Sequence, residues 1–117
     1  MKIGFAVMTE FLKHQEIYTL VNMVKAAQAK GHQVSGIFFF GSGVMNVQKK
    51  GHLGKTTINI PQVLAECGAQ MYACQTWADN YGIFAEDVID KVEVTGLGEL
   101  SNMTAESDKM IFFGAHA

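Results

Sequence analysis

Cys74 is the residue whose chemistry and position best suit a reactive site. It ends the apolar run Met71 to Cys74 and precedes the polar segment Gln75 to Gly82. In open α/β sheets, ligands bind beyond the carboxyl ends of the strands, and Cys74 is the only strong nucleophile at a predicted strand end. If a helical turn begins at Gln75, its N–H groups point toward the sulfur and favour the thiolate, the reactive form in sulfur exchange. The alternative interpretation is a small buried hydrophobic side chain.

A glycine turn and a basic segment are candidates to lie near this strand end. Gly41-Ser42-Gly43 follows the second predicted strand, and a tight turn there would bring backbone N–H groups near the strand ends. It lacks the third glycine of a dinucleotide fingerprint. Residues 41–57 are predicted to be mostly loop, made basic by lysines. His52 in this segment is a candidate proton donor or cation near Cys74, against the commoner alternative of a solvated side chain.

The residues that follow Cys74 are candidate contacts for a substrate or partner. Gln75 and Thr76 come directly after the cysteine. Trp77 and Tyr81 are four residues apart and would share one helical face. We interpret this pair as a pocket wall or a contact between proteins, with a place in the core as the alternative.

The sequence offers no convincing metal or cofactor motif. Cys67 and Cys74 do not form a C-x-x-C pair, and the histidines are not at metal-ligand spacing from either cysteine. Gly54-Lys55-Thr56 resembles part of a phosphate loop, but the glycine required five residues earlier is Lys49. We therefore expect no metal and no organic cofactor, and no disulfide between the two cysteines.

Strand-like and helix-like segments alternate along the chain, which predicts a three-layer α/β/α sandwich around a five-stranded, mainly parallel sheet. Three consecutive phenylalanines, Phe38 to Phe40, cannot alternate between core and solvent, so we expect both faces of that strand to be covered. The expected strands are 3–8, 34–40, 71–74, 92–95 and 110–113. The expected helices are 14–30, 59–67, 84–90 and 98–107.

Length and charge limit the classes of function. The 117 residues fit a single domain, 1–117, and a hydrophobic content of 49% can form a core. A net charge of -2 argues against direct binding of nucleic acid. No segment approaches the roughly 20 apolar residues of a membrane span, and two cysteines do not make a disulfide scaffold. We expect a cytoplasmic protein.

The order of several segments resembles the DsrE/DsrF-like (TusD-like) family of sulfur-relay proteins. Ala73-Cys74 with Asp79-Asn80-Tyr81-Gly82-Ile83 is similar to its cysteine segment, and residues 94–100 and 107–113 are similar to its closing helix and strand. The resemblance implies assembly into homotrimers or hexamers, or into assemblies of several chain types. It also implies that Cys74 carries sulfur as a persulfide between a donor and an acceptor protein. Residues 48–57 match least, so this resemblance says little about the choice of partner.

The sequence therefore supports one main hypothesis and two alternatives. The main hypothesis is a sulfur carrier, possible sulfurtransferase, in which an accessible Cys74 thiolate exchanges sulfur. The first alternative is a non-catalytic module for assembly or for binding a small anion or nucleotide, with Cys74 only lining the site. The second is a flavodoxin-like electron carrier, which lacks a convincing flavin phosphate loop here.

Overall fold

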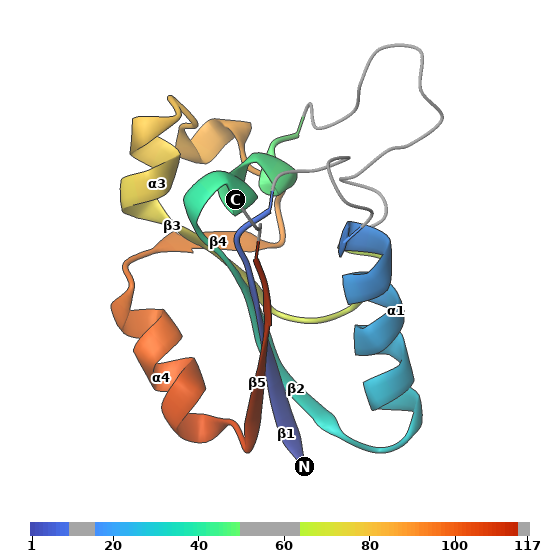
Figure 1. Ribbon diagram of the computed structural model, residues 1–117. Helices are drawn as coiled ribbons and strands as arrows, with labels where there is room; N and C mark the ends of the chain where they lie inside the picture. Colours follow the sequence, from blue (N-terminus) through green and yellow to red (C-terminus); the bar gives the residue numbers. More distant parts are fainter. Residues whose placement is uncertain (10–15, 50–63, 115–117) are drawn as a thin grey trace.

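Parallel strands form the centre of the molecule, with helices on both sides (Figure 1). The computed structural model describes residues 1–9, 16–49 and 64–114. In chain order the elements are β1 (Lys2–Val7), α1 (Glu16–Ala29), β2 (Gln33–Phe39), η1 (Gly41–Val47), β3 (Met71–Cys74), α3 (Gln75–Asn80), η2 (Ala85–Asp87), β4 (Val92–Thr95), α4 (Gly98–Glu106) and β5 (Lys109–Phe113).

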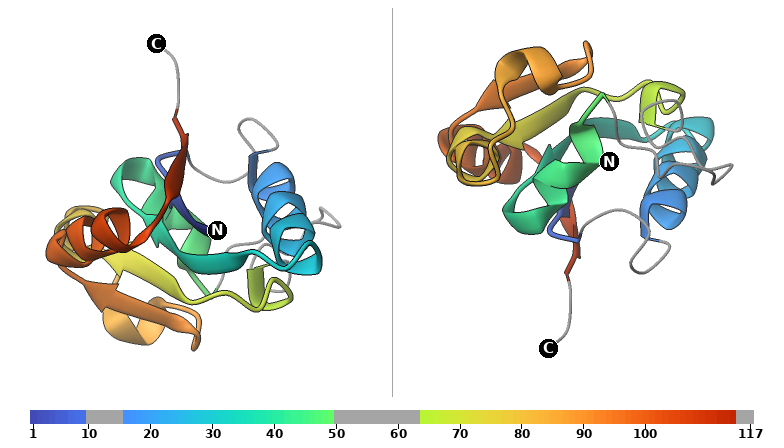
Figure 2. Two further views of the ribbon diagram at one scale, coloured as in Figure 1. Left: turned by 90° about the horizontal axis from the view of Figure 1, so that it is seen from below. Right: turned by 90° about the horizontal axis from the view of Figure 1, so that it is seen from above.

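The described strands form one five-stranded sheet in the order β4-β3-β2-β1-β5. Every pairing between neighbouring strands is parallel. α1 lies on one side of the sheet and α4 on the other, as both views of Figure 2 show. The predicted α/β architecture, with a layer of helices on each face of the sheet, is confirmed.

Strand β2 is buried on both faces, which accounts for its consecutive phenylalanines. Phe38 and Phe39 point to opposite faces because successive side chains alternate along a strand, and neither has exposed surface. The Phe38 ring lies 6.3 Å, centroid to centroid, from the ring of Tyr72 on the neighbouring strand β3. Both faces of β2 are thus covered, as expected for a central parallel strand.

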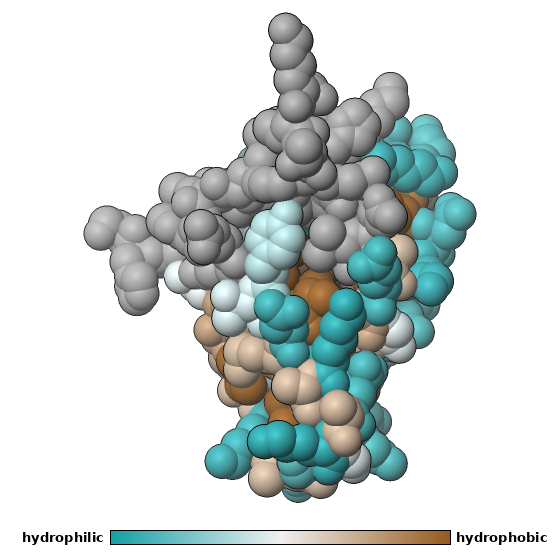
Figure 3. Space-filling view, turned by 90° about the vertical axis from the view of Figure 1, so that its right-hand side faces the viewer, coloured by the Kyte–Doolittle hydropathy of each residue, from teal (hydrophilic) through white to brown (hydrophobic). Residues whose placement is uncertain are grey.

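Helix α1 buries one face and ends at a glycine. The side chains of Ile17, Leu20 and Val24 recur at spacings of three and four residues and are buried against the sheet. Burial of each contributes on the order of 2 kcal/mol. Gly31, with φ 83°, closes the helix, and its N–H donates to the carbonyl of Gln28. Figure 3 shows this side of the molecule, where hydrophilic side chains surround smaller apolar areas.

Two predictions about local structure are wrong. Residues 41–47, expected to be loop, form the 3-10 helix η1, because this short segment packs its valines into the core despite its glycines. The expected helix 84–90 is reduced to the single turn η2, Ala85–Asp87, and the backbone after it extends to pair with residue 48. Of the helix expected over 59–67, residues 59–63 lie outside the described part of the chain.

Candidate functional site

The carboxyl ends of the strands meet at one edge of the sheet. Parallel pairing places Cys74 of β3 opposite Thr95 of β4, and β1 and β2 end beside them at Val7 and Phe39. Both η1 and α3 leave this edge, and the view from above in Figure 2 shows η1 close to the centre of the edge. The sequence prediction that these strand ends lie together is confirmed.

Cys74 ends β3 and occupies the N-cap position of α3, with φ -70° and ψ 121°. The helical turn predicted after it is confirmed as α3. Its side chain points to the same face of the sheet as that of Tyr72, two residues earlier. That face is the one covered by α4, since a side chain at Gly36 would meet both Tyr72 and Met103 of α4.

The prediction that the Cys74 sulfur is accessible is wrong. The Cys74 side chain is 0% exposed, and Cys67 is 2% exposed. Both are free thiols. η1 packs against β3 and against α3, the two elements that meet at Cys74, so tertiary packing rather than local sequence removes this residue from solvent.

The glycine turn rests directly on the end of β1. The Ser42 hydroxyl donates to the Met8 carbonyl at 2.8 Å, and the Phe40 N–H donates to the Val7 carbonyl at 3.0 Å. The Gly43 N–H donates to the carbonyl of Phe40 at 3.0 Å. Gly41-Ser42-Gly43 is therefore a tight turn at the strand ends, as predicted, but the N–H of its last residue is used inside the turn.

Asn46 is a residue of this edge that the sequence reasoning missed. Its side-chain NH2 donates to the carbonyls of Thr9, at 2.7 Å, and Gly43, at 2.9 Å. The side chain is fully buried, and its Oδ1 atom has no hydrogen-bond partner among the residues that the structure describes. The only available signal was one amide residue within the apolar run Val44 to Val47, which marks a polar group that must be satisfied in the core.

The outer surface of α3 carries the other predicted contact residues. Gln75 and Thr76 are exposed beside the buried cysteine. The rings of Trp77 and Tyr81 stack with centroids 6.3 Å apart and an interplanar angle of 27°, which confirms that they share one face. They are exposed, so the alternative that they belong to the core is wrong. His52 lies outside the described residues.

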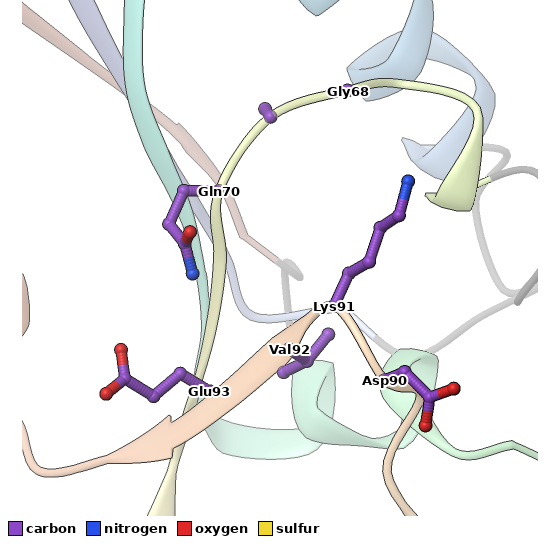
Figure 4. Close-up of a pocket in the computed structure, with 7 residues that line it drawn as sticks. Gly68, Gln70, Asp90, Lys91, Val92 and Glu93 are labelled. Carbon is purple, nitrogen blue, oxygen red and sulfur yellow. The ribbon is translucent and has the colours of Figure 1, made fainter.

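Cys74 lines neither of two cavities in the described part of the protein. One cavity, of 660 Å³, lies at the amino ends of β3 and β4 and is lined by residues such as Gln70, Lys91 and Glu93. Figure 4 shows the Lys91 side chain reaching across this hollow toward the turn at Gly68. A second cavity, of 280 Å³, lies beside Tyr81 at the end of α3.

Among the described residues, Tyr72 is the titratable group whose pKa clearly departs from its ordinary value. Burial, then the negative charges of Glu99 and Glu93, raise its pKa above 10.0. A phenol held neutral in this way keeps its proton and donates a hydrogen bond to a neighbouring acceptor, which α4 supplies in Glu99. Tyr72 shares its sheet face with Cys74 but lies one side-chain row further from the carboxyl edge.

The described residues contain no group of three or more histidine, cysteine, aspartate or glutamate side chains arranged to hold a metal ion. No helix in residues 1–9, 16–49 and 64–114 has the length and apolar character needed to cross a membrane.

Comparison with known proteins identifies the family. A model of the DsrE/DsrF-like family matches residues 1–113, so the chain belongs to this family. A protein of Methanopyrus kandleri, named "Uncharacterized protein MK0008", is 32% identical over 102 residues, which cover 85% of this chain and 83% of that protein. The crystal structure of the ychN protein from E. coli superimposes with a TM-score of 0.81 at 22% identity, covering 97% of this chain and 99% of that chain. This structural likeness shows the shared fold.

A further relative carries a functional name. A protein of Allochromatium vinosum named "Putative sulfurtransferase DsrE" is 26% identical over 117 residues, covering 87% of this chain and 90% of that protein.

Proposed function

We propose that this protein is a sulfur carrier that accepts sulfane sulfur as a persulfide on Cys74 and passes it to a partner protein. The observation that carries the proposal is the place of Cys74 at the carboxyl end of β3, on the edge where ligands of open α/β sheets bind. Membership of the DsrE/DsrF-like family and the name of the Allochromatium relative support it.

The proposed chemistry is two successive thiolate exchanges. The Cys74 thiolate attacks the outer sulfur of a donor persulfide, a new S–S bond forms on Cys74, and the donor leaves as a thiolate. An acceptor thiolate then attacks the outer sulfur of the Cys74 persulfide, and Cys74 leaves as a thiolate. The sulfur atom moves as a unit, so neither step needs an external oxidant or reductant.

Burial of Cys74 means that exchange requires a local opening. α3 has six residues, and within it only Ala78 is buried, so few apolar contacts oppose its movement away from η1. Unwinding of its first turn would expose the N-cap cysteine without disturbing the strands. We propose that contact with the donor or acceptor protein favours this opened state.

Mass spectrometry of the intact protein tests the proposal. After incubation with a protein persulfide donor, the wild type should gain the mass of one sulfur atom, and Cys74→Ser should gain none. Cys67→Ser is the matched control because it removes the other buried thiol, and it should load like the wild type. Equal loading of Cys74→Ser and the wild type, or loss of loading only in Cys67→Ser, would contradict the proposed function.

The buried sulfur also favours a second candidate, a module for binding a small anion or nucleotide or for assembly, in which Cys74 only packs. Under this candidate, neither a persulfide donor nor a partner changes the reactivity of Cys74. Either function is compatible with assembly of copies into a trimer or hexamer, as proposed from the family resemblance. Light scattering after size-exclusion chromatography measures that assembly.

A further inference from the structure

An exposed aromatic pair lies beside a small acidic cavity at the end of α3. Trp77 is 39% exposed and Tyr81 is 46% exposed, and their rings stack on one another. Tyr81 also lines the cavity of 280 Å³, together with Glu86 and Asp87 from η2 and Lys49 from the segment after η1. We call the Trp77–Tyr81 pair and this cavity the α3 pocket.

The described lining of the α3 pocket carries more negative than positive charge. It has two carboxylates, Glu86 and Asp87, and one ammonium group, that of Lys49, which also lies 3.9 Å from the Asp90 carboxylate just outside the lining. The Asp87 carboxylate accepts the N–H of Phe84 at 3.1 Å, which fixes its position. Glu86 is exposed and makes no ion pair with a lysine of the described residues. Within the described residues, the pocket therefore combines an aromatic surface with an excess of negative charge.

We propose that the α3 pocket binds an arginine-bearing segment of a partner protein. A guanidinium group stacks on aromatic faces and donates to carboxylates, which matches the two kinds of surface present. The cavity volume lies just below the ~300 Å³ at which pockets for whole small molecules begin, so it suits a single side chain. A purely apolar partner would bury Glu86 and Asp87 without counter-charges, which is costly.

This inference names the kind of partner that would bind beside Cys74, and in that respect it rests on the proposed function. Trp77 lies three residues after Cys74, so a segment held by the α3 pocket contacts the same short helix that must open for sulfur exchange. Binding is measured here without any sulfur on Cys74. Loss of binding and loss of persulfide loading are therefore separate results.

The fluorescence of Trp77 provides the assay, because it is the single tryptophan of the chain. The full-length protein is titrated with the peptide acetyl-Gly-Arg-Gly-Arg-Gly-amide and with the same peptide carrying citrulline, a neutral analogue of arginine. We expect a saturable change in emission for the arginine peptide, with a dissociation constant on the order of 1 mM or tighter. Binding should weaken as salt is added, and the citrulline peptide should bind several-fold more weakly, about three-fold or more.

Two glutamate variants locate the binding. Glu86→Gln removes the charge from the pocket and should weaken binding of the arginine peptide about three-fold, and Glu86→Lys about ten-fold. Glu106→Gln, at the C-terminal end of α4, is the matched control and should bind like the wild type. Circular dichroism checks that each variant is folded.

Three results would overturn the inference. The first is the absence of a saturable response to the arginine peptide, and the second is equal binding of the arginine and citrulline peptides. The third is a Trp77 emission that changes with protein concentration alone and does not respond to peptide, which would show that a second copy of the chain covers the pocket.

Discussion

Gly43 lies against the backbone carbonyl of Val7, at the point where β1 ends. A Cβ atom on Gly43 would lie in steric conflict with the Val7 carbonyl oxygen, 2.9 Å from its carbonyl carbon and 3.2 Å from the Cα of Met8. This close approach fixes the position of η1 on the carboxyl edge of the sheet. Because η1 also packs against β3 and α3, the same contact helps to determine how Cys74 is covered.

The first prediction is that Gly43→Ala destabilises the protein. The added methyl group meets backbone atoms, which cannot rotate away as a side chain can, so η1 or β1 must shift. We expect the free energy of unfolding to fall by about 1–3 kcal/mol. Urea denaturation followed by circular dichroism measures this change.

Gly98→Ala is the control for this prediction. Gly98 begins α4, and a Cβ atom there meets nothing within 4 Å. The substitution should leave the unfolding free energy unchanged or raise it by about 0.5 kcal/mol, because alanine restricts the unfolded chain. A Gly43→Ala protein as stable as Gly98→Ala would show that the close approach to Val7 is not present in solution.

The second prediction concerns Asn46, whose NH2 group donates to two carbonyls inside the protein. In Asn46→Asp, a carboxylate would face these two carbonyl oxygens without a donor, so burial and repulsion should raise the pKa of the new carboxyl group in the folded state. Near pH 7 we expect a loss of about 3 kcal/mol or more in the unfolding free energy.

The loss of stability in Asn46→Asp should depend on pH. Between the unfolded and folded pKa values the folded state binds the extra proton, so the stability of Asn46→Asp relative to wild type should fall as pH rises through that interval. Asn22→Asp, on the exposed surface of α1, is the control and should show little change. Equal effects of the two substitutions would contradict the buried role of Asn46.

The sequence predicted the sheet well because strand signals are local. Phe38 and Phe39 required two covered faces whatever packed on them, and the glycine at 31 marked the end of α1 directly. The burial of Cys74 was not predictable in this way, because it depends on η1, a segment distant in sequence whose glycines favoured loop. Asn46 was missed for the same reason, since the two carbonyls that bind it come from separate parts of the chain.

The third prediction concerns stability at high pH. The raised pKa of Tyr72 means that the folded state keeps its phenolic proton where the unfolded state, near the ordinary value of 10.0, loses it. The folded state then binds more protons, so stability should fall as pH rises above the unfolded pKa. Tyr72→Phe should reduce this loss above about pH 10.

Tyr18→Phe, on the opposite side of the sheet from Glu99 and Glu93, is the control for Tyr72→Phe. It removes the hydroxyl of an exposed tyrosine and so serves as the reference for the loss of a phenol elsewhere on the protein. Thermal unfolding at several pH values measures both variants. An alkaline slope that Tyr72→Phe does not alter would show that burial and the carboxylates of Glu99 and Glu93 do not raise the pKa of this phenol.

The last prediction is that Cys74 reacts slowly in the native protein and that its rate follows the packing of η1. A fully buried thiol reacts with iodoacetamide only through a local opening, so we expect the labelling rate to be about 100-fold or more below that of the unfolded chain. Gly43→Ala should raise the labelling rate at Cys74, because it disturbs the packing of η1 against β1, while Gly98→Ala should not.

Peptide mapping separates Cys74 from Cys67, which serves as the internal control because it is buried at the other end of β3. Labelling of native Cys74 as fast as that of the unfolded chain would contradict its burial. An equal rise at both cysteines in Gly43→Ala would instead indicate global unfolding rather than opening at the carboxyl edge.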